Sequence, residues 1–237
     1  MTQNFEYDLL VIGAGSGGVR AARKSAEFGA RVAVIEEAAL GGTCVNLGCI
    51  PKKLYVYASE YAAAWRDSTG FGWQSEGITF DWSTLRDNKT KEIARLNAIY
   101  GRLLEAPGVD IIQGHGRLTG PQEVAVGDAH YRAEKILLAT GTWPARPDIP
   151  GIELALTSNE IFDLPELPER LLIVGGGYIA TEFASIFSGL GSGVTQSYRG
   201  KLFLRGFDHD VRHFLAEEMQ KAGVDLRFNH HVTALQR

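Results

Sequence analysis

The stretch Asp8-Leu-Leu-Val-Ile-Gly13-Ala-Gly15-Ser-Gly17-Gly18 decides the fold of this 237-residue chain. Its apolar run, over residues 7–12, is continuous rather than alternating, which is typical of a buried parallel strand. An Ala-rich segment over residues 15–28 favours a helix, and Arg31–Glu36 is a second apolar run. The order strand, helix, strand predicts a βαβ unit.

The glycines of this stretch follow the pattern G-x-G-x-x-G at Gly13, Gly15 and Gly18. In such a turn the first glycine permits the tight bend and the second lets a pyrophosphate approach the backbone. The third allows close packing of helix on strand. The phosphate then sits at a helix N-terminus, which favours an anion. Glu36, 23 residues after Gly13, can accept hydrogen bonds from a ribose diol. Together these features predict a dinucleotide-binding module.

A second module of the same kind begins at Arg170–Gly175, where Gly175-Gly-Gly177-Tyr-Ile-Ala180 follows an apolar run. A helix is expected over residues 178–190 and a strand over residues 193–198. The two first glycines are 162 residues apart, too far for a solenoid repeat. We therefore expect two separate dinucleotide-binding modules.

The second module lacks the acid of the first. Tyr198 stands at the matching position, and three cations follow it, at Arg199, Lys201 and Arg205. Cations suit a 2′-phosphate, which a carboxylate would repel. The pattern favours NADPH over NADH. The alternative is that these residues form a solvated charge run.

The remaining segments give the outline of the domains. Helices are expected over about 54–66, 82–104 and 211–222, and short strands over 109–112, 123–126, 135–139, 225–228 and 232–235. Five of the eight prolines fall within residues 144–168, which marks the domain boundary. We expect an α/β fold with two Rossmann-like modules and a small antiparallel β-meander, the second module being incomplete.

Composition excludes several classes of protein. With 24 basic and 28 acidic residues the net charge is −4, which argues against nucleic acid as a partner. No apolar run reaches the roughly 18 residues of a membrane helix. The lead Met1–Glu6 has no features of a signal peptide. A cytoplasmic protein is expected.

The two cysteines, Cys44 and Cys49, are five positions apart. On a regular α-helix their Cα atoms would lie roughly 8–9 Å apart, whereas a disulfide needs less than about 7 Å. They can therefore pair only on a distorted turn, which Gly48 would permit. A metal site would need further ligands, and no histidine lies within 60 residues of Cys49. A redox pair is favoured over a metal site or inert buried thiols.

The segment Gly41-Gly-Thr-Cys-Val-Asn-Leu-Gly-Cys-Ile-Pro-Lys-Lys53 resembles the flavin-dependent disulfide reductases, the class I pyridine nucleotide-disulfide oxidoreductases. The resemblance runs from Tyr7 to the last residue. It implies an FAD domain over residues 1–150 and an NADPH domain over residues 151–237, with a C-terminal dimerisation domain absent from the chain. It also implies that Cys44–Cys49 is a redox disulfide beside the flavin. Cys49 would be the flavin-proximal thiolate of a charge-transfer complex, and Cys44 the thiol that attacks the substrate.

The resemblance assigns further residues to each ligand. Lys52 and Glu182 would pair beside the flavin, and Tyr178 would be a gate over it. FAD would be bound by Gly13, Gly15, Ser16, Gly17, Gly18, Glu36, Gly42, Thr43, Cys44, Lys52, His115, Gly116, Thr140 and Gly141. NADPH would be bound by Gly175, Gly176, Gly177, Tyr178, Ile179, Glu182, Arg199 and Arg205.

For the substrate, residues of the first helix and of the helix over 82–104 resemble those of members that reduce glutathione disulfide. Arg23 would bind a glycine carboxylate of that substrate, whereas a site for a cationic substrate would avoid this charge. The other matching positions are Ser16, Val19, Ile99 and Tyr100. Glu92 and Leu103 depart from the pattern and leave fine specificity open.

Two alternatives remain. One is an NAD-linked dihydrolipoamide dehydrogenase, and the other is a non-catalytic FAD-binding fragment. The family's acid–base His–Glu pair comes from the dimerisation domain of a homodimer, and nothing in this chain matches it. The 237 residues alone are therefore expected to be an inactive part of a longer enzyme.

Overall fold

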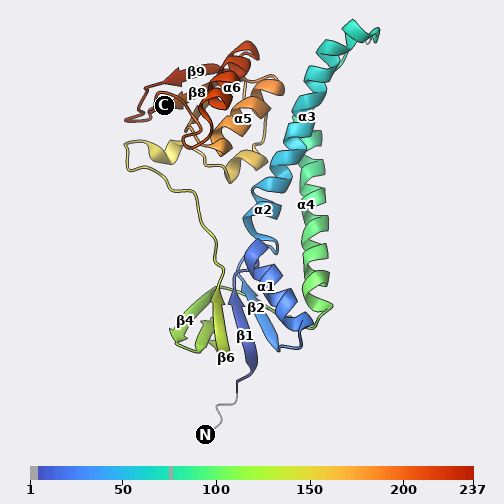
Figure 1. Cartoon of the computed structure of the whole chain (residues 1–237), viewed down its shortest axis with the longest axis vertical. Coiled ribbons are helices and arrows are strands. Elements are labelled where there is room, and N and C mark those ends of the chain that lie inside the picture. Colours follow the sequence, from blue (N-terminus) through green and yellow to red (C-terminus); the bar gives the residue numbers. More distant parts are fainter. Residues whose placement is uncertain (1–4, 75–76) are drawn as a thin grey trace. The chain divides into compact units, whose positions relative to one another are not determined.

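The computed structural model describes residues 5–74 and 77–237 (Figure 1). Residues 1–4, part of the lead noted above, lie outside the described residues. The chain divides into two compact units. The first unit comprises Met1–Pro51 and Lys89–Trp143, and the second comprises Lys52–Asn88 and Pro144–Arg237.

The first unit contains a six-stranded sheet in the order β3-β2-β1-β6-β5-β4. Strands β1, β2, β3 and β6 pair in parallel, and β4, β5 and β6 form an antiparallel meander. The strand bounds are β1 (Tyr7–Ile12), β2 (Val32–Glu36), β3 (Asp110–Gln113), β4 (Gly116–Gly120), β5 (Glu123–Val126) and β6 (Ala129–Leu138). The helices that begin or end in this unit are α1 (Ser16–Glu27), α2 (Gly42–Asn46), α3 (Cys49–Ser68) and α4 (Trp82–Glu105).

The central strand β1 is buried on both faces. Val11 packs in one cluster with Val19 and Ala22 of α1, whereas Leu10 and Ile12 pack in a second cluster on the opposite face. Because both faces are covered, the strand reads as a continuous apolar run. Figure 1 shows α1 lying along β1 and β2.

The second unit contains a parallel sheet in the order β7-β8-β9. Its elements are β7 (Arg170–Val174), α5 (Tyr178–Gly189), β8 (Gly193–Tyr198), α6 (His209–Lys221) and β9 (Asp225–Phe228), with 3-10 turns at Thr69–Phe71, Ile152–Leu154 and Glu160–Asp163. The order β7, α5, β8 is the second βαβ unit. The α/β class with two modules and a small meander is confirmed.

An aromatic core ties residues 52–88 to the second unit. The Tyr55 hydroxyl donates to the Phe162 carbonyl at 2.7 Å, and its ring lies 5.2 Å from that of Trp82. Trp82 Nε1 donates to the Leu164 carbonyl at 2.8 Å. Phe183 joins the same cluster. These contacts explain why residues 52–88 group with the second unit although they precede the expected boundary at residue 150.

Three local expectations differ from the structure. Helix α3 begins at Cys49 rather than near residue 54, because Pro51 is tolerated in the first turn of a helix. Strand β4 was not expected. Residues 232–235 do not form the expected strand: Leu235 N donates to the Pro150 carbonyl at 2.8 Å, but the segment joins neither sheet.

No helix within the described residues combines the length and the apolar character needed to cross a membrane.

Candidate functional site

The first glycine loop connects β1 to α1 and is shaped by close backbone contacts. Gly13 has a φ of 102°, and a Cβ atom there would overlap the Ala139 carbonyl. A Cβ atom at Gly18 would overlap the Gly13 carbonyl, whereas one at Gly17 would meet nothing within 4 Å. Gly13 and Gly18 therefore hold the turn against its neighbours. Gly17 leaves open space at the start of α1, where the backbone can approach a pyrophosphate.

The Glu36 carboxylate, at the end of β2, is held in place by two backbone donors. Glu36 Oε2 accepts from Ala14 N at 2.7 Å, and Glu36 Oε1 accepts from Ala38 N at 2.9 Å. These bonds hold the acid beside the glycine turn, and its role toward a ribose stays a prediction. Nearby, His115 Nδ1 lies 2.7 Å from an oxygen of Glu37, and both side chains are exposed.

Further flavin-site candidates follow strands of the same sheet. Gly116 begins β4, where a Cβ atom would lie 3.1 Å from Ile35. Thr140 and Gly141 follow the end of β6 and are exposed, and Gly141 has a φ of 70°. Their suggested contacts with FAD stay predictions.

The cysteine loop packs against the glycine loop. Gly41 N donates to the Ala14 carbonyl at 2.8 Å. Gly42 has a φ of 59°, and a Cβ atom there would lie 2.5 Å from the Cα atom of Gly15. The contact requires glycine at position 42 and brings α2, which contains Thr43 and Cys44, next to the dinucleotide turn.

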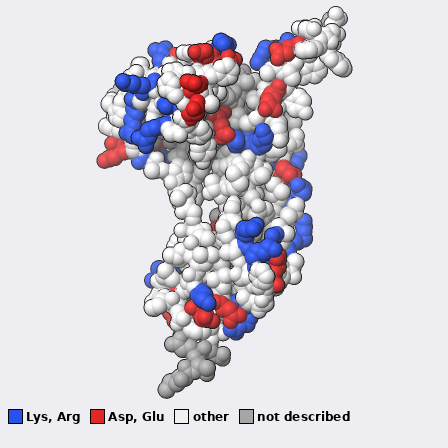
Figure 2. Space-filling model, viewed as in Figure 1, with Lys and Arg blue, Asp and Glu red and all other residues white. Residues whose placement is uncertain are grey.

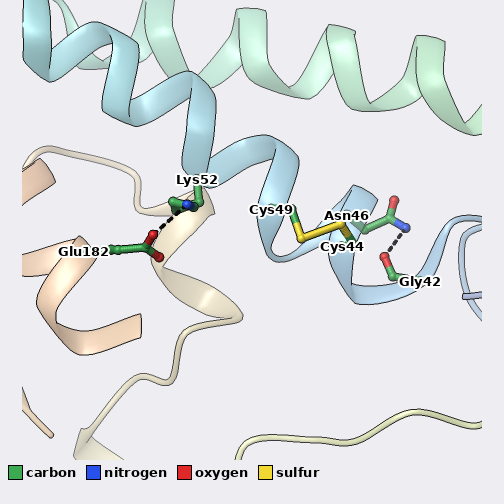
Figure 3. Close-up of a disulfide and its surroundings, with 6 residues drawn as sticks. All are labelled: Gly42, Cys44, Asn46, Cys49, Lys52 and Glu182. Atoms are coloured by element: carbon green, nitrogen blue, oxygen red, sulfur yellow. Dashed lines mark hydrogen bonds and ion pairs between the residues drawn. A yellow bond between two sulfur atoms is a disulfide. The ribbon is translucent and has the colours of Figure 1, made fainter. Parts of the chain in front are cut away.

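Cys44 and Cys49 form a disulfide with their Cα atoms 4.6 Å apart (Figure 3). The chain leaves α2 after Asn46 and enters α3 at Cys49, so the pair spans a break between helices. A Cβ atom at Gly48 would lie 3.0 Å from the Thr43 carbonyl oxygen. The expected distorted turn with a permissive Gly48 is therefore present. Among the described residues, no group of three His, Cys, Asp or Glu side chains could hold a metal ion.

Two asparagines brace this turn, and their role was not foreseen. Asn46 Nδ2 donates to the Gly42 carbonyl at 2.9 Å, as Figure 3 shows. Asn97 Nδ2, from α4, donates to Asn46 Oδ1 at 2.9 Å and to the Leu40 carbonyl at 2.8 Å. The position of Asn46 between the two cysteines could have drawn attention to it, but its partner Asn97 lies 51 residues away in the sequence.

Lys52 and Glu182 meet in the second unit. Lys52 Nζ lies 2.7 Å from Glu182 Oε1, although the two residues are 130 positions apart (Figure 3). Their side chains are 24% and 38% exposed. Lys52 lies three residues after Cys49 on α3, and Glu182 lies four residues after the exposed Tyr178 on α5. The pairing that the family resemblance implied is present, and its role beside a flavin stays a prediction.

In the second glycine loop the ring of Tyr198, which stands where the first module has Glu36, packs against Gly176. Gly175 has a φ of 153°, and a Cβ atom at Gly176 would overlap the Tyr198 ring. Leu204 N donates to the Gly176 carbonyl at 2.6 Å, which ties the segment after β8 to the glycine loop. Gly177 precedes α5 and faces open space.

A cavity of about 450 Å³ lies beside this segment. Lys201 and Arg205 line it, but Arg199 does not. Arg199 and Ile179 are exposed. Of the two arginines assigned to NADPH, Arg205 lines this cavity and Arg199 does not, and the assignment of both to NADPH stays a prediction.

The substrate candidates lie on α1 and α4 of the first unit. Arg23 lines a shallow cavity of about 440 Å³ together with Leu103. Its Nε lies 3.3 Å from Glu27 Oε1 without the geometry of a hydrogen bond. Ser16 is exposed, Ile99 and Tyr100 are half-buried, and Val19 is 6% exposed. Val19 thus packs in the core, and the assignment of these residues to the substrate stays a prediction.

Comparisons with known proteins agree with this arrangement. The chain is 50% identical over 235 residues to a glutathione reductase of Burkholderia cepacia, and this match covers 99% of the chain and 52% of the relative. A glutathione reductase of Nostoc is 45% identical over 98% of the chain and 51% of its own length. A trypanothione reductase of Leishmania donovani is 42% identical over 94% of the chain and 50% of its own length. The chain thus spans about half the length of these curated relatives.

A solved structure of a flavoprotein disulfide reductase is also similar to this chain. A Cu(II) complex of the HOCl-induced flavoprotein disulfide reductase RclA from Escherichia coli superposes with a TM-score of 0.86 at 32% identity. The superposition covers 99% of this chain and 52% of that one. The sequence profile of the pyridine nucleotide-disulphide oxidoreductases matches residues 7–237. The chain belongs to the pyridine nucleotide-disulphide oxidoreductase family.

Proposed function

We propose that the chain carries the coenzyme sites and the redox disulfide of an NADPH-dependent flavoprotein that reduces glutathione disulfide. One observation carries the proposal: the Cys44–Cys49 disulfide spans a helix break that packs directly on the dinucleotide-binding turn at Gly15. The proposal assigns FAD to residues 1–150 and NADPH to residues 151–237. A homodimer in the cytoplasm belongs to the same proposal and rests on the resemblance to this family.

The residues present fit an FAD. The open space at Gly17 suits a pyrophosphate, and the fixed Glu36 carboxylate suits a ribose diol. When bound, FAD and NADPH would supply the two electrons that open the disulfide. Lys52, three residues after Cys49, forms an ion pair with Glu182 that fixes both side chains. We propose that this pair helps to position the flavin.

The thiols then act in sequence. Cys49 is the first residue of the 20-residue helix α3, and a helix N-terminus favours a thiolate. The Cys44 thiolate attacks one sulfur of the substrate disulfide, forming a mixed disulfide and releasing the first glutathione. The Cys49 thiolate attacks the Cys44 sulfur, which restores the protein disulfide and releases the second glutathione. Each departing thiolate takes up one proton.

Arg23 supports glutathione disulfide over a cationic disulfide such as that of trypanothione. Its guanidinium lines the cavity on α1 and can pair with a substrate carboxylate. A partly exposed ion pair contributes about 0.2–1 kcal/mol. The preference from Arg23 alone is then at most about fivefold.

A trapping experiment tests the proposal without requiring turnover. The reduced Cys49→Ser chain is mixed with glutathione disulfide, and adducts are located by peptide mass spectrometry. We expect one glutathione on Cys44. Adding Arg23→Ala should slow trapping by up to about fivefold, whereas Arg20→Ala, at an exposed position of the same helix, should not slow it. Absence of the Cys44 adduct, or equal trapping of glutathione and trypanothione disulfides, would contradict the proposal.

A further inference from the structure

A buried amide contacts the second glycine loop. Gln196, on β8, is fully buried. Its Nε2 atom donates to the Gly175 carbonyl at 3.0 Å and to Thr181 Oγ1 at 3.3 Å. Thr181, which is also buried, donates from Oγ1 to the Gly177 carbonyl at 3.1 Å. The two side chains therefore bind the first and the third carbonyl of the loop.

These bonds set the direction of the loop's N–H groups. A trans peptide bond holds its carbonyl and the following N–H on opposite sides. Because the Gly175 carbonyl faces Gln196, the N–H of Gly176 faces away from it. The N–H of Tyr178 likewise faces away from the partner of the Gly177 carbonyl, and it belongs to the first turn of α5, where N–H groups have no partner within the helix. Such donors suit a pyrophosphate.

The first module has apolar side chains at the two matching positions. Val34 and Gln196 each lie 21 positions after the first glycine of their module. Val19 and Thr181 each lie six positions after it. Both valines are buried in one core cluster. Valine thus satisfies the packing at both positions, so packing alone does not explain the amide and the hydroxyl of the second module.

The third position of the glycine pattern also differs between the modules. It is Gly18 in the first, where a Cβ atom would overlap the Gly13 carbonyl oxygen, and Ala180 in the second. Because Ala180 carries a Cβ atom, the Gly175 carbonyl cannot lie against α5 as the Gly13 carbonyl lies against α1. The two first glycines differ in φ accordingly, at 102° and 153°. The Gly175 carbonyl binds Gln196 instead.

The amide also has an unfavourable feature. Among the residues that the structure describes, none donates to Gln196 Oε1, which is buried. Turning the amide around would place this oxygen against the Gly175 carbonyl, which cannot donate, so that carbonyl fixes the orientation. A buried acceptor without a donor is destabilising. An amide at this position therefore indicates a role other than stability.

We propose that Gln196 is a positioning residue of the second dinucleotide site. Its Nε2 atom holds the Gly175 carbonyl directly and the Gly177 carbonyl through Thr181, so that the N–H groups of the loop are presented to the pyrophosphate of the coenzyme. The inference rests on the proposed function, since the coenzyme would be NADPH. It adds two residues, Gln196 and Thr181, that the glycine pattern did not indicate.

Two ligands separate the glycine loop from the rest of the site. NADPH contains the pyrophosphate, whereas adenosine 2′-monophosphate contains only the 2′-phosphate. Two of the cations that would bind the 2′-phosphate, Lys201 and Arg205, line the cavity after β8. Figure 2 shows Lys and Arg side chains gathered over the β8–β9 part of this unit. A change confined to the glycine loop should therefore weaken the binding of NADPH and leave that of the monophosphate unchanged.

Three variants test the role of the amide by titration with both ligands. Gln196→Met keeps an unbranched side chain of similar length but cannot donate to the Gly175 carbonyl. Thr181→Val introduces the residue of the first module and breaks the bond to the Gly177 carbonyl. Thr195→Val is the control on the same strand, because its side chain points to the opposite face of the sheet.

Hydrogen exchange in the ligand-free chain gives a second readout that does not depend on coenzyme. The N–H of Gly175 donates to the Ser197 carbonyl at 2.9 Å, so its exchange with deuterium, followed by NMR, reports how firmly the loop is held. The N–H of Gly13 donates to the Ile35 carbonyl at 2.7 Å in the first module and serves as the internal reference.

We expect Gln196→Met to weaken NADPH binding about twofold to tenfold, which corresponds to one hydrogen bond. Exchange at Gly175 should become faster by a similar factor, with Gly13 and the affinity for the monophosphate unchanged. Thr181→Val should act in the same direction, and it decides the question if Gln196→Met does not fold. Thr195→Val should match the unchanged chain.

Two results would overturn the role of Gln196 and leave the NADPH proposal standing. One is equal NADPH affinity and equal Gly175 exchange in the unchanged chain and in the variants at 196 and 181. The other is an equal weakening of both ligands, which would indicate a general loss of structure. If the unchanged chain binds NADPH no tighter than the monophosphate, both proposals are wrong.

Discussion

Replacing Gly18 with Ala should damage the first module through a single atom. A Cβ atom at position 18 would overlap the carbonyl oxygen of Gly13, which belongs to the glycine turn itself. This oxygen is backbone and cannot rotate away. Helix α1 would have to move off β1, and the turn that is proposed to hold the pyrophosphate would open.

The size of the effect follows from two opposing contributions. Overpacking a buried site costs about 1–3 kcal/mol, and a clash with fixed backbone belongs at the upper end. A Gly→Ala change within a helix stabilises the helix by up to about 1 kcal/mol, because alanine has the higher helix propensity. We therefore expect Gly18→Ala to lower the free energy of unfolding by about 2 kcal/mol, which is roughly 4–8 °C in the melting temperature of a chain of this size.

Gly17→Ala is the matched control, because it lies next to Gly18 in the same turn of α1 and its Cβ would meet nothing within 4 Å. Urea denaturation followed by circular dichroism should show no loss of stability for Gly17→Ala and the 2 kcal/mol loss for Gly18→Ala. Binding of FAD, followed by flavin fluorescence, should weaken in both variants. A Gly18→Ala protein that is as stable as the unchanged chain would refute the packing argument.

Three further predictions concern the thiols, the coenzyme and pH. With FAD bound and the remaining thiol reduced, Cys44→Ser should show a long-wavelength flavin absorbance band and Cys49→Ser should not. The reverse pattern would exchange the roles of the two thiols. Arg205→Leu should reduce the preference for binding NADPH over NADH by at least about tenfold, roughly 1.4 kcal/mol. Arg199→Leu, at a residue outside the cavity, should change that preference less. Equal effects of the two variants would contradict the assignment of the cavity to NADPH. Burial and a hydrogen bond to a carboxylate raise the pKa of Tyr7 to about 12. Its contribution to stability is therefore present below the unfolded value near pH 10 and lost as the pH rises toward 12, and urea midpoints of Tyr7→Phe should lack this dependence.

Local sequence patterns predicted the central elements of the fold. Strands β1, β5, β8 and β9 have the bounds expected from their apolar runs. Gly13 and Gly18 have the turn and packing roles that the glycine pattern implies. Each of these features depends on residues that lie close together in the sequence, and hydrophobic periodicity and glycine spacing are patterns over such short stretches.

The features that the sequence did not predict depend on contacts between residues far apart in the chain. Tyr55 joins the core of the second unit through the Phe162 carbonyl, 107 residues away. The Asn46–Asn97 bond likewise spans two helices. Leu204 N likewise donates to the Gly176 carbonyl, 28 positions earlier in the chain. No single-sequence pattern encodes such distances.

The most direct test of the proposed redox centre is to follow the Cys44–Cys49 disulfide under NADPH. The chain reconstituted with FAD is mixed with NADPH without oxygen, alkylated, and digested for peptide mass spectrometry. We predict two new alkylated thiols per chain, one at Cys44 and one at Cys49, and far fewer with NADH. If NADPH bleaches the flavin while the disulfide stays intact, the assignment of Cys44–Cys49 as the electron acceptor is contradicted.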